Sequence, residues 1–157
     1  MALIRDYQPE DFDELWHIDQ QCFALGIAYS RRELAAYIRR SRAFTLIATD
    51  GAGHILGFIV AESDRTGVGH ILTIDVRPSE QRNGLGTRLL HAAQSRLLHE
   101  NCNAVLLETA VDNAPALNFY KRHGYSVLET IPRYYLDSVD ALVMGRHLRP
   151  APKAEKS

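Results

Sequence analysis

The chain has 157 residues, enough for one domain with a proper core and too few for two ordinary ones. Apolar residues make up 46% of it and charged residues 24%, and the formal net charge is −1. These values are typical of a globular protein, and they lack the basic surplus of a nucleic-acid or anionic-membrane binder. We therefore expect neither nucleic acid nor a membrane as a partner.

Neither a targeting segment nor a metal site stands out. The first residues turn acidic too early for a signal peptide, and no apolar stretch approaches the roughly 20 residues that span a bilayer. Cys22 and Cys102 lie far apart without CxxC spacing, and the seven histidines are scattered. We expect a cytoplasmic protein with no disulfide framework and no metal.

Hydrophobic periodicity and turn residues place the elements in chain order. A short strand at 2–7 precedes a helix opened by Pro9, and Ser30 and Glu33 have the capping-box spacing that starts a second helix. Asn113 is placed to cap a later helix that Gly124 ends. The further strands are expected at 44–49, 54–63, 68–76, 104–111, 125–131 and 140–148, with helices at 86–100 and from 113 through 120.

This order predicts one α/β domain over residues 1–149 and a disordered polar tail at 150–157. The segment 68–111 is a strand–helix–strand unit, whose strands should be parallel with a right-handed crossover. The remaining connections indicate antiparallel pairing. The expected fold is a mixed, mostly antiparallel sheet of about seven strands with a central parallel unit.

The stretch QRNGLG, residues 81–86, separates an apolar strand from a helix. A Walker loop needs a lysine that is missing here, and a Rossmann fingerprint needs a third glycine where Leu89 stands. Two readings remain on spacing alone. The glycines form a tight turn, or they let the free amides of a helix N-terminus approach a pyrophosphate.

The motifs resemble those of the GNAT N-acetyltransferases. QRNGLG matches their acyl-CoA pyrophosphate loop, Q/R-x-x-G-x-G/A, and LLETAVDNAPALNFYKRHGY resembles their second signature, with Asn113, Ala116, Tyr120 and Gly124 in register. The end of the chain, IPRYYLDSVDALVMGRHL, resembles the N-terminal protein acetyltransferases of that family. The resemblance covers nearly the whole chain and implies the GNAT fold, with helices on both faces of the sheet.

The resemblance implies acetyl-CoA as cosubstrate and assigns its contacts. The pyrophosphate would lie on the backbone of Arg82, Asn83, Gly84, Leu85, Gly86 and Thr87. The pantetheine arm would pair with Ile74, Asp75 and Val76 like an added strand, and the Val76 amide would donate to the oxyanion. Asn113 matches a cofactor-contacting asparagine and is equally a natural helix cap.

Two residues match the catalytic positions of the family. Glu108 would be the general base that takes a proton from the amine, and Tyr120 the general acid that protonates the departing thiolate. The structural alternatives are a salt-bridged glutamate at a strand end and an aromatic packing residue. Tyr134 and Tyr135 match loop tyrosines that clasp a peptide N-terminus, and Tyr29 would line the other wall; exposed or core-packed aromatics are the alternatives.

Two departures concern the acceptor. Where the bacterial ribosomal-protein acetyltransferases read E-V-R, this chain reads Glu108-Thr109-Ala110, and the connection after Tyr135 is shorter. We expect acetyl transfer to a protein or peptide N-terminus. The alternatives are a small amine, such as an amino acid or polyamine, and a non-catalytic acyl-CoA-binding domain. The family resemblance also predicts a homodimer.

Overall fold

The structure is a computed structural model that describes residues 2–23, 27–135 and 139–148. Within these residues, seven strands and four α-helices follow one another in the predicted order, with short 3-10 turns at Pro9–Asp11 and Pro78–Glu80. In chain order they are β1 (Leu3–Asp6), α1 (Phe12–Cys22), α2 (Arg31–Ile38), β2 (Ala43–Thr49), β3 (Ile55–Ser63), β4 (Val68–Val76), α3 (Leu85–His99), β5 (Ala104–Ala110), α4 (Ala114–Arg122), β6 (Ser126–Tyr135) and β7 (Val139–His147).

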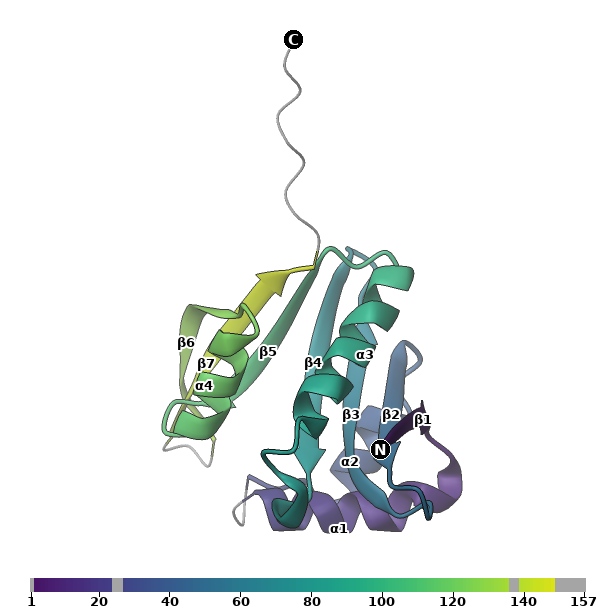
Figure 1. Cartoon of the computed structure of the whole chain (residues 1–157). Coiled ribbons are helices and arrows are strands. Elements are labelled where there is room, and N and C mark those ends of the chain that lie inside the picture. The colour runs from purple at the N-terminus through teal and green to yellow at the C-terminus, as the bar shows by residue number, and fades with distance from the viewer. Residues whose placement is uncertain (1, 24–26, 136–138, 149–157) are drawn as a thin grey trace.

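The strands form one sheet in the order β1-β2-β3-β4-β5-β7-β6 (Figure 1). Neighbours pair antiparallel except β4 and β5, which are parallel and joined by α3. The predicted mixed sheet with a central parallel unit is therefore confirmed. The predicted tail at 150–157 lies outside the described residues.

The helix boundaries follow local chemistry that the sequence signals. Ser30 caps α2 by accepting from the Glu33 amide at 3.1 Å, and the Glu33 carboxylate accepts from the Ser30 amide at 3.1 Å. Asn113 Oδ1 caps α4 by accepting from the Ala116 amide at 3.2 Å. Gly124 follows α4 with φ +86°, a left-handed conformation that glycine adopts without strain.

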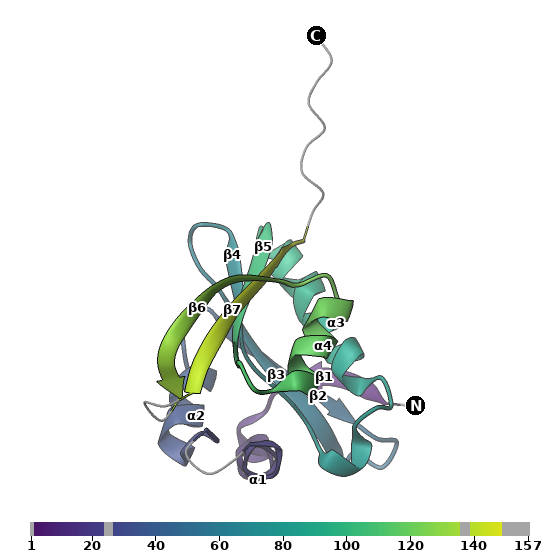
Figure 2. The ribbon, with the colours of Figure 1, turned by 90° about the vertical axis from the view of Figure 1, so that its left-hand side faces the viewer.

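The helices cover both faces of the sheet (Figure 2). On one face, α3 and α4 pack over a core that includes Leu89, Leu97 and Met144. On the other face, α1 and α2 pack over a second core that includes Leu15, Leu34 and Phe58. Successive side chains of a central strand therefore point alternately toward the α3–α4 layer and the α1–α2 layer. This alternation decides which layer each polar residue of β4 and β5 faces.

One element differs from the sequence-based expectation. β6 runs through Tyr135 rather than ending near residue 131, so Tyr134 and Tyr135 lie on a strand and not on a loop. Its pairing with β7 shifts register between Ile131 and Tyr135, and Arg133 has φ +55°. Because β6 is an edge strand, it tolerates both Pro132 and this irregularity without ending.

Candidate active site

The sheet opens at its centre, where β4 and β5 part. These parallel strands pair only over Val68–His70 and Ala104–Leu106. Beyond that point β4 continues to Val76 and β5 to Ala110 without pairing with each other, and the two strands diverge in Figure 1. The carboxyl-terminal halves of both strands therefore present unpaired backbone edges to each other.

On the edge of β4 that faces the opening, two alternate residues, Ile74 and Val76, point their backbone groups away from β3. The Arg77 amide donates to the Leu56 carbonyl at 2.9 Å. Because hydrogen-bonded and non-hydrogen-bonded pairs alternate in an antiparallel ladder, the register of Gly57 with Val76 turns the N–H and C=O of Val76 and Ile74 away from β3. The two N–H groups and the Ile74 carbonyl face the opening toward β5, as an added strand would require. The Val76 carbonyl already accepts from Cys22 Sγ at 3.2 Å and from Gln81 Nε2 at 3.1 Å.

Asp75 lies between these residues but is turned elsewhere. Its side chain is 1% exposed, accepts from the Thr73 hydroxyl at 2.5 Å and lies against the buried Asp19 of α1. Burial, reinforced by the hydrogen bond with Asp19, raises the pKa of Asp75 well above its usual range. Asp75 therefore joins β4 to α1 rather than facing the opening.

The glycine-rich loop has the geometry of an anion cradle. Gly84 is the N-cap residue of α3 with φ +80°, and Arg82 also has positive φ, at 70°. Among the described residues, none accepts a hydrogen bond from the amides of Arg82–Thr87, and the ladder of α3 starts only at the Arg88 amide. A Cβ at Gly84 would meet nothing within 4 Å, so the loop is open to a ligand. The structure therefore contains the free amides that the pyrophosphate reading needs.

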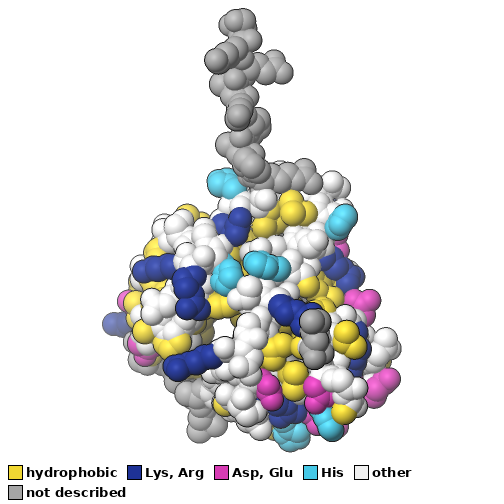
Figure 3. Space-filling view, viewed as in Figure 1, with side chains coloured by type: hydrophobic (Ala, Val, Ile, Leu, Met, Phe, Trp, Pro, Cys, Tyr) yellow, Lys and Arg dark blue, Asp and Glu magenta, His cyan; other side chains and the backbone are white. Residues whose placement is uncertain are grey.

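A histidine pair lies beside the first turn of α3. Figure 3 shows the face that carries α3 and α4, with histidines gathered near its centre and Lys and Arg side chains beside them. Thr87 Oγ1 lies 3.0 Å from His123 Nε2, and the rings of His91 and His123 are 5.4 Å apart. Burial, aided by His91, lowers the pKa of His123. This contact ties the first turn of α3 to the end of α4.

Glu108 lies on β5 just beyond the last residue that pairs with β4. Leu107 faces the α3–α4 core, so by alternation Glu108 projects toward the α1–α2 side. Its carboxylate is 25% exposed, and Oε2 lies 2.5 Å from Nε2 of His70. The predicted structural alternative, a paired glutamate, therefore has a partner, but that partner is a histidine at the apex of the opening.

Tyr120 is 7% exposed and packs edge-on against Tyr125 at 5.6 Å and Phe119 at 5.3 Å. Burial raises its pKa strongly, and the nearby Tyr125, Asp75 and Tyr135 add to this. The phenol is therefore neutral throughout the working pH range. No hydrogen-bond partner of its hydroxyl is found among the described residues.

The predicted acceptor-side tyrosines come together from distant parts of the chain. The rings of Tyr134 and Tyr135 are 4.9 Å apart. The pKa of each is raised by burial, and the Glu108 carboxylate contributes to both shifts. Tyr29 lies nearby: its hydroxyl donates to the Leu72 carbonyl of β4 at 3.1 Å, and Tyr135 contributes to its raised pKa after burial and Tyr37. The structure thus brings Tyr29, Tyr135 and Glu108 to one region.

Asn113 is the helix cap described above, and this hydrogen bond occupies its side-chain oxygen. Three residues near the site carry no motif in the sequence: His70, the partner of Glu108; Glu62, which lies beside His70; and Tyr37, whose ring lies 5.0 Å from that of Tyr29. The alternation of side chains along each strand, which the sequence shows, places His70 and Glu108 on definite faces of the sheet. The sequence does not show where the two strands stop pairing, and that point is what makes the two residues neighbours.

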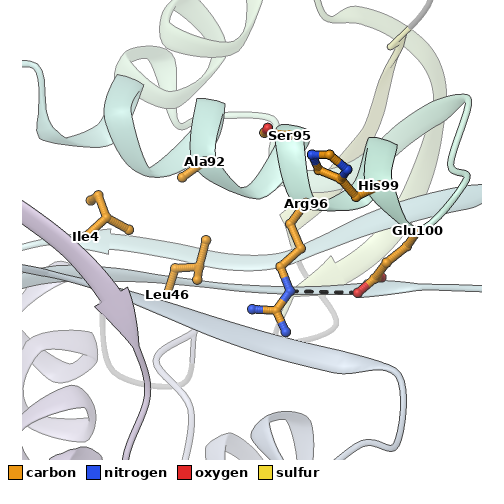
Figure 4. Close-up of a pocket in the computed structure, with 7 residues that line it drawn as sticks. All are labelled: Ile4, Leu46, Ala92, Ser95, Arg96, His99 and Glu100. Carbon is orange, nitrogen blue, oxygen red and sulfur yellow. Dashed lines mark ion pairs between the residues drawn. The ribbon is translucent and has the colours of Figure 1, made fainter.

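A shallow hollow of about 560 Å³ lies elsewhere (Figure 4). Ile4, Leu46 and Ala92 line it, and Arg96 spans it toward Glu100. None of the predicted site residues borders it, so it is not the candidate active site. Within the described residues, no cluster of His, Cys, Asp or Glu is arranged to hold a metal ion. No helix in those same residues is long and apolar enough to cross a bilayer.

Comparison with known proteins agrees with this geometry. The family model described as the acetyltransferase (GNAT) family matches residues 7–125. An N-acetyltransferase of Methanocaldococcus jannaschii is 31% identical over 143 residues, covering 90% of this chain and 89% of that protein. An N-alpha-acetyltransferase of Sulfurisphaera tokodaii is 37% identical over 81 residues, covering 51% of this chain but only 48% of that protein.

The fold is also that of a solved acetyltransferase. The crystal structure of the ribosomal-protein-S18-alanine N-acetyltransferase from Escherichia coli superposes with a TM-score of 0.86, at 22% identity and full coverage of both chains. The chain belongs to the GNAT acetyltransferase family. It is accordingly an acetyl-CoA-dependent N-acetyltransferase, which transfers the acetyl group from the thioester to an amine.

Proposed function

We propose that the acceptor is the α-amine of a protein or peptide N-terminus. The observation that carries this proposal is that the structure brings three tyrosines into the region of Glu108. The Glu108 carboxylate acts electrostatically on Tyr134 and Tyr135, whose rings are in contact, and Tyr135 acts in the same way on Tyr29. Relatives named as N-alpha-acetyltransferases support it. An extended peptide end can lie between the aromatic side chains and present its amine to the carboxylate.

In this proposal the reaction is a direct attack of the amine on the thioester. The substrate ammonium loses a proton to Glu108, and the neutral amine attacks the acetyl carbonyl. The Val76 N–H, which faces the opening, donates to the developing oxyanion. The C–S bond then breaks, and the Tyr120 hydroxyl protonates the thiolate. Glu108 releases the first proton to solvent. The nitrogen that attacked carries a positive charge, and it loses a second proton that restores the Tyr120 hydroxyl through solvent, so one proton is released overall.

The cosubstrate is held by backbone groups on two sides of the opening. We assign its pyrophosphate to the amides of Arg82–Thr87 and its pantetheine arm to the edge of β4 at Ile74 and Val76. We assign Asn113 to the cosubstrate site as the helix cap that fixes the start of α4. Holding both reactants in this way supplies much of the rate, because a bimolecular reaction becomes effectively unimolecular.

The test measures CoA release from acetyl-CoA with a mixed panel of acceptors. One half contains peptides that begin with alanine, serine or methionine, and the other half contains free amino acids and polyamines. Turnover confined to peptides is the expected result. Turnover confined to small amines would leave the enzyme class intact and overturn the acceptor. Binding of acetyl-CoA without turnover of any amine would favour a binding module.

Two broader expectations belong to this proposal. The cytoplasmic location agrees with a substrate that is a newly exposed protein N-terminus, and fractionation of the source cells tests it. The homodimer predicted from the family resemblance is tested by sedimentation over a range of protein concentrations. A single monomeric species at all concentrations would remove it.

A further inference from the structure

Four charged or titratable side chains form a row across the α1–α2 face of the sheet. His70 Nε2 on β4 lies 2.5 Å from Glu108 Oε2 on β5. On its other side, His70 Nδ1 lies 4.0 Å from Glu62 Oε1 on β3. Arg40, which follows α2, donates from Nη1 to Glu62 Oε1 at 2.7 Å. The row, hereafter the Arg40–Glu62–His70–Glu108 row, crosses three adjacent strands.

The register of the sheet places His70 where it can reach Glu108. His70 is the last residue of β4 that pairs with β5, opposite Leu106. Glu108 is two residues further along β5, so its side chain lies on the same face as that of Leu106. The strands part immediately beyond His70. Its ring therefore stands at the apex of the opening and points along β5.

A single hydrogen bond matters for a carboxylate in this position. The terminal torsion of a glutamate is broad, so an exposed carboxylate samples many orientations. A donor on one oxygen fixes the plane of the group and leaves the other oxygen for the incoming amine. His70 is held in turn, because Glu62 lies beside Nδ1 and Arg40 fixes Glu62.

We propose that His70 is a positioning residue for the reaction: it donates from Nε2 to Glu108 Oε2 and thereby aims Oε1 at the acceptor amine, while Glu62 and Arg40 hold its ring. This inference rests on the proposed function, in which Glu108 is the base. It adds a residue that neither takes the proton nor touches the acetyl group. Its contribution is to the orientation of the base, which affects kcat more than binding.

The test compares two substitutions at His70. His70→Ala should lower kcat about tenfold to a hundredfold, since a misplaced catalytic group costs up to roughly that factor. The KM for acetyl-CoA should not change. His70→Gln keeps a side-chain N–H donor and should recover a large part of kcat. Equal losses in both variants, with the fold intact, would overturn the inference, because a hydrogen bond alone would then not be what the histidine supplies.

A matched control is available on the same molecule. His54 Nδ1 lies 3.1 Å from Asp50 Oδ2 in the exposed β2–β3 turn, which contributes no residue to the candidate site. His54→Ala removes a similar histidine–carboxylate pair and should leave kcat and KM unchanged. Glu62→Gln should cause a smaller loss of kcat than His70→Ala, because it loosens the ring without removing it.

Two further measurements separate this inference from the proposed function. If Glu108→Gln leaves turnover unchanged, Glu108 is not the base and the proposed mechanism fails. If Glu108→Gln is inactive but His70→Ala is fully active, only the positioning role fails. The nitrogen resonances of the His70 ring should also shift in Glu108→Gln, a readout independent of activity. Unchanged resonances would overturn the contact itself.

Discussion

Tyr120 offers its hydroxyl in a setting that fits a proton donor. The ring is buried, its pKa is raised by that burial, and the phenol therefore keeps its proton at any pH at which the enzyme works. Removing the hydroxyl changes neither the volume of the ring nor its packing. The chemistry at this residue can thus be tested almost without disturbing the fold.

Tyr120→Phe should lower kcat by about a hundredfold, the lower range for loss of a general acid. The free energy of unfolding should stay close to that of the wild type, since no partner of the hydroxyl is lost. Steady-state kinetics and urea unfolding check both parts. Tyr125→Phe is the matched control: it removes a hydroxyl that accepts from Gln94 Nε2 at 2.8 Å and should cost about 1 kcal/mol of stability without affecting kcat. A fully active Tyr120→Phe would contradict the role of Tyr120 as the acid.

The buried pair of Asp19 and Asp75 makes stability depend on pH. The folded-state pKa of Asp75 is raised above the unfolded value, chiefly by burial and then by Asp19. A raised folded pKa gives stability that is present below the unfolded value of 3.8 and is lost as pH rises through the folded pKa. Asp75→Asn keeps a neutral, hydrogen-bonding side chain at all pH values.

We therefore expect Asp75→Asn to gain stability relative to the wild type as the pH is raised above the ordinary carboxyl range. Urea unfolding of both proteins across acidic to mildly alkaline pH measures the difference. Since the backbone of Asp75 is unchanged, acetyl-CoA affinity should not move. A difference in unfolding free energy that stays constant with pH would contradict the raised pKa of Asp75.

At the scale of elements, the start of α3 depends on the left-handed conformation of Gly84. A side chain at this φ is strained by about 1 kcal/mol or more. In Gly84→Ala the free loop relaxes to avoid that strain, and binding of acetyl-CoA must force it back into the strained conformation. The Kd for acetyl-CoA should therefore rise about fivefold. Calorimetry checks this value.

Gly53 provides the control for this loop. It also has positive φ, at 89°, and a Cβ there would likewise meet nothing within 4 Å. Gly53→Ala therefore introduces similar strain in the β2–β3 turn and should leave the acetyl-CoA Kd unchanged. If both alanine variants weakened binding equally, general destabilisation and not the shape of the loop would be responsible.

The element boundaries show what local sequence can and cannot predict. Ser30 with Glu33, Asn113 and Gly124 mark helix ends through chemistry that acts within a few residues, and the structure has all of these caps. The length of β6 was missed because Pro132 normally ends a strand, and only its edge position, a property of the whole sheet, permits it to continue.

The candidate site was predictable only in part for the same reason. The glycine loop, Glu108 and Tyr120 were found from motifs with fixed spacing in the chain. The contact of His70 with Glu108 depends on residues 38 positions apart and on where two strands stop pairing. The burial of Asp75 against Asp19 likewise depends on the packing of α1 under β4. Neither is encoded in a local pattern.

At the scale of the whole molecule, acetyl-CoA should fill the opening between β4 and β5 when it binds. Its pantetheine arm would satisfy the edge groups of β4, so amide exchange at Ile74 and Val76 and over Arg82–Thr87 should slow. Amides of β2, which is paired on both sides, should be unaffected. Hydrogen–deuterium exchange with and without acetyl-CoA measures this. Uniform slowing across the sheet would indicate global stabilisation instead.

The short pairing at Val68–His70 also divides the chain in a simple way. Of the described residues, those up to the end of α3 lie on the β4 side of the sheet, and those from β5 onward lie on the other side (Figure 1). The turn after His99 is thus the covalent link between the two sides. A protein cut there would become two contiguous fragments with complementary apolar surfaces, one ending with α3 and one beginning with β5. Such a pair could serve as a split reporter, in which acetylation activity returns only when the two halves meet.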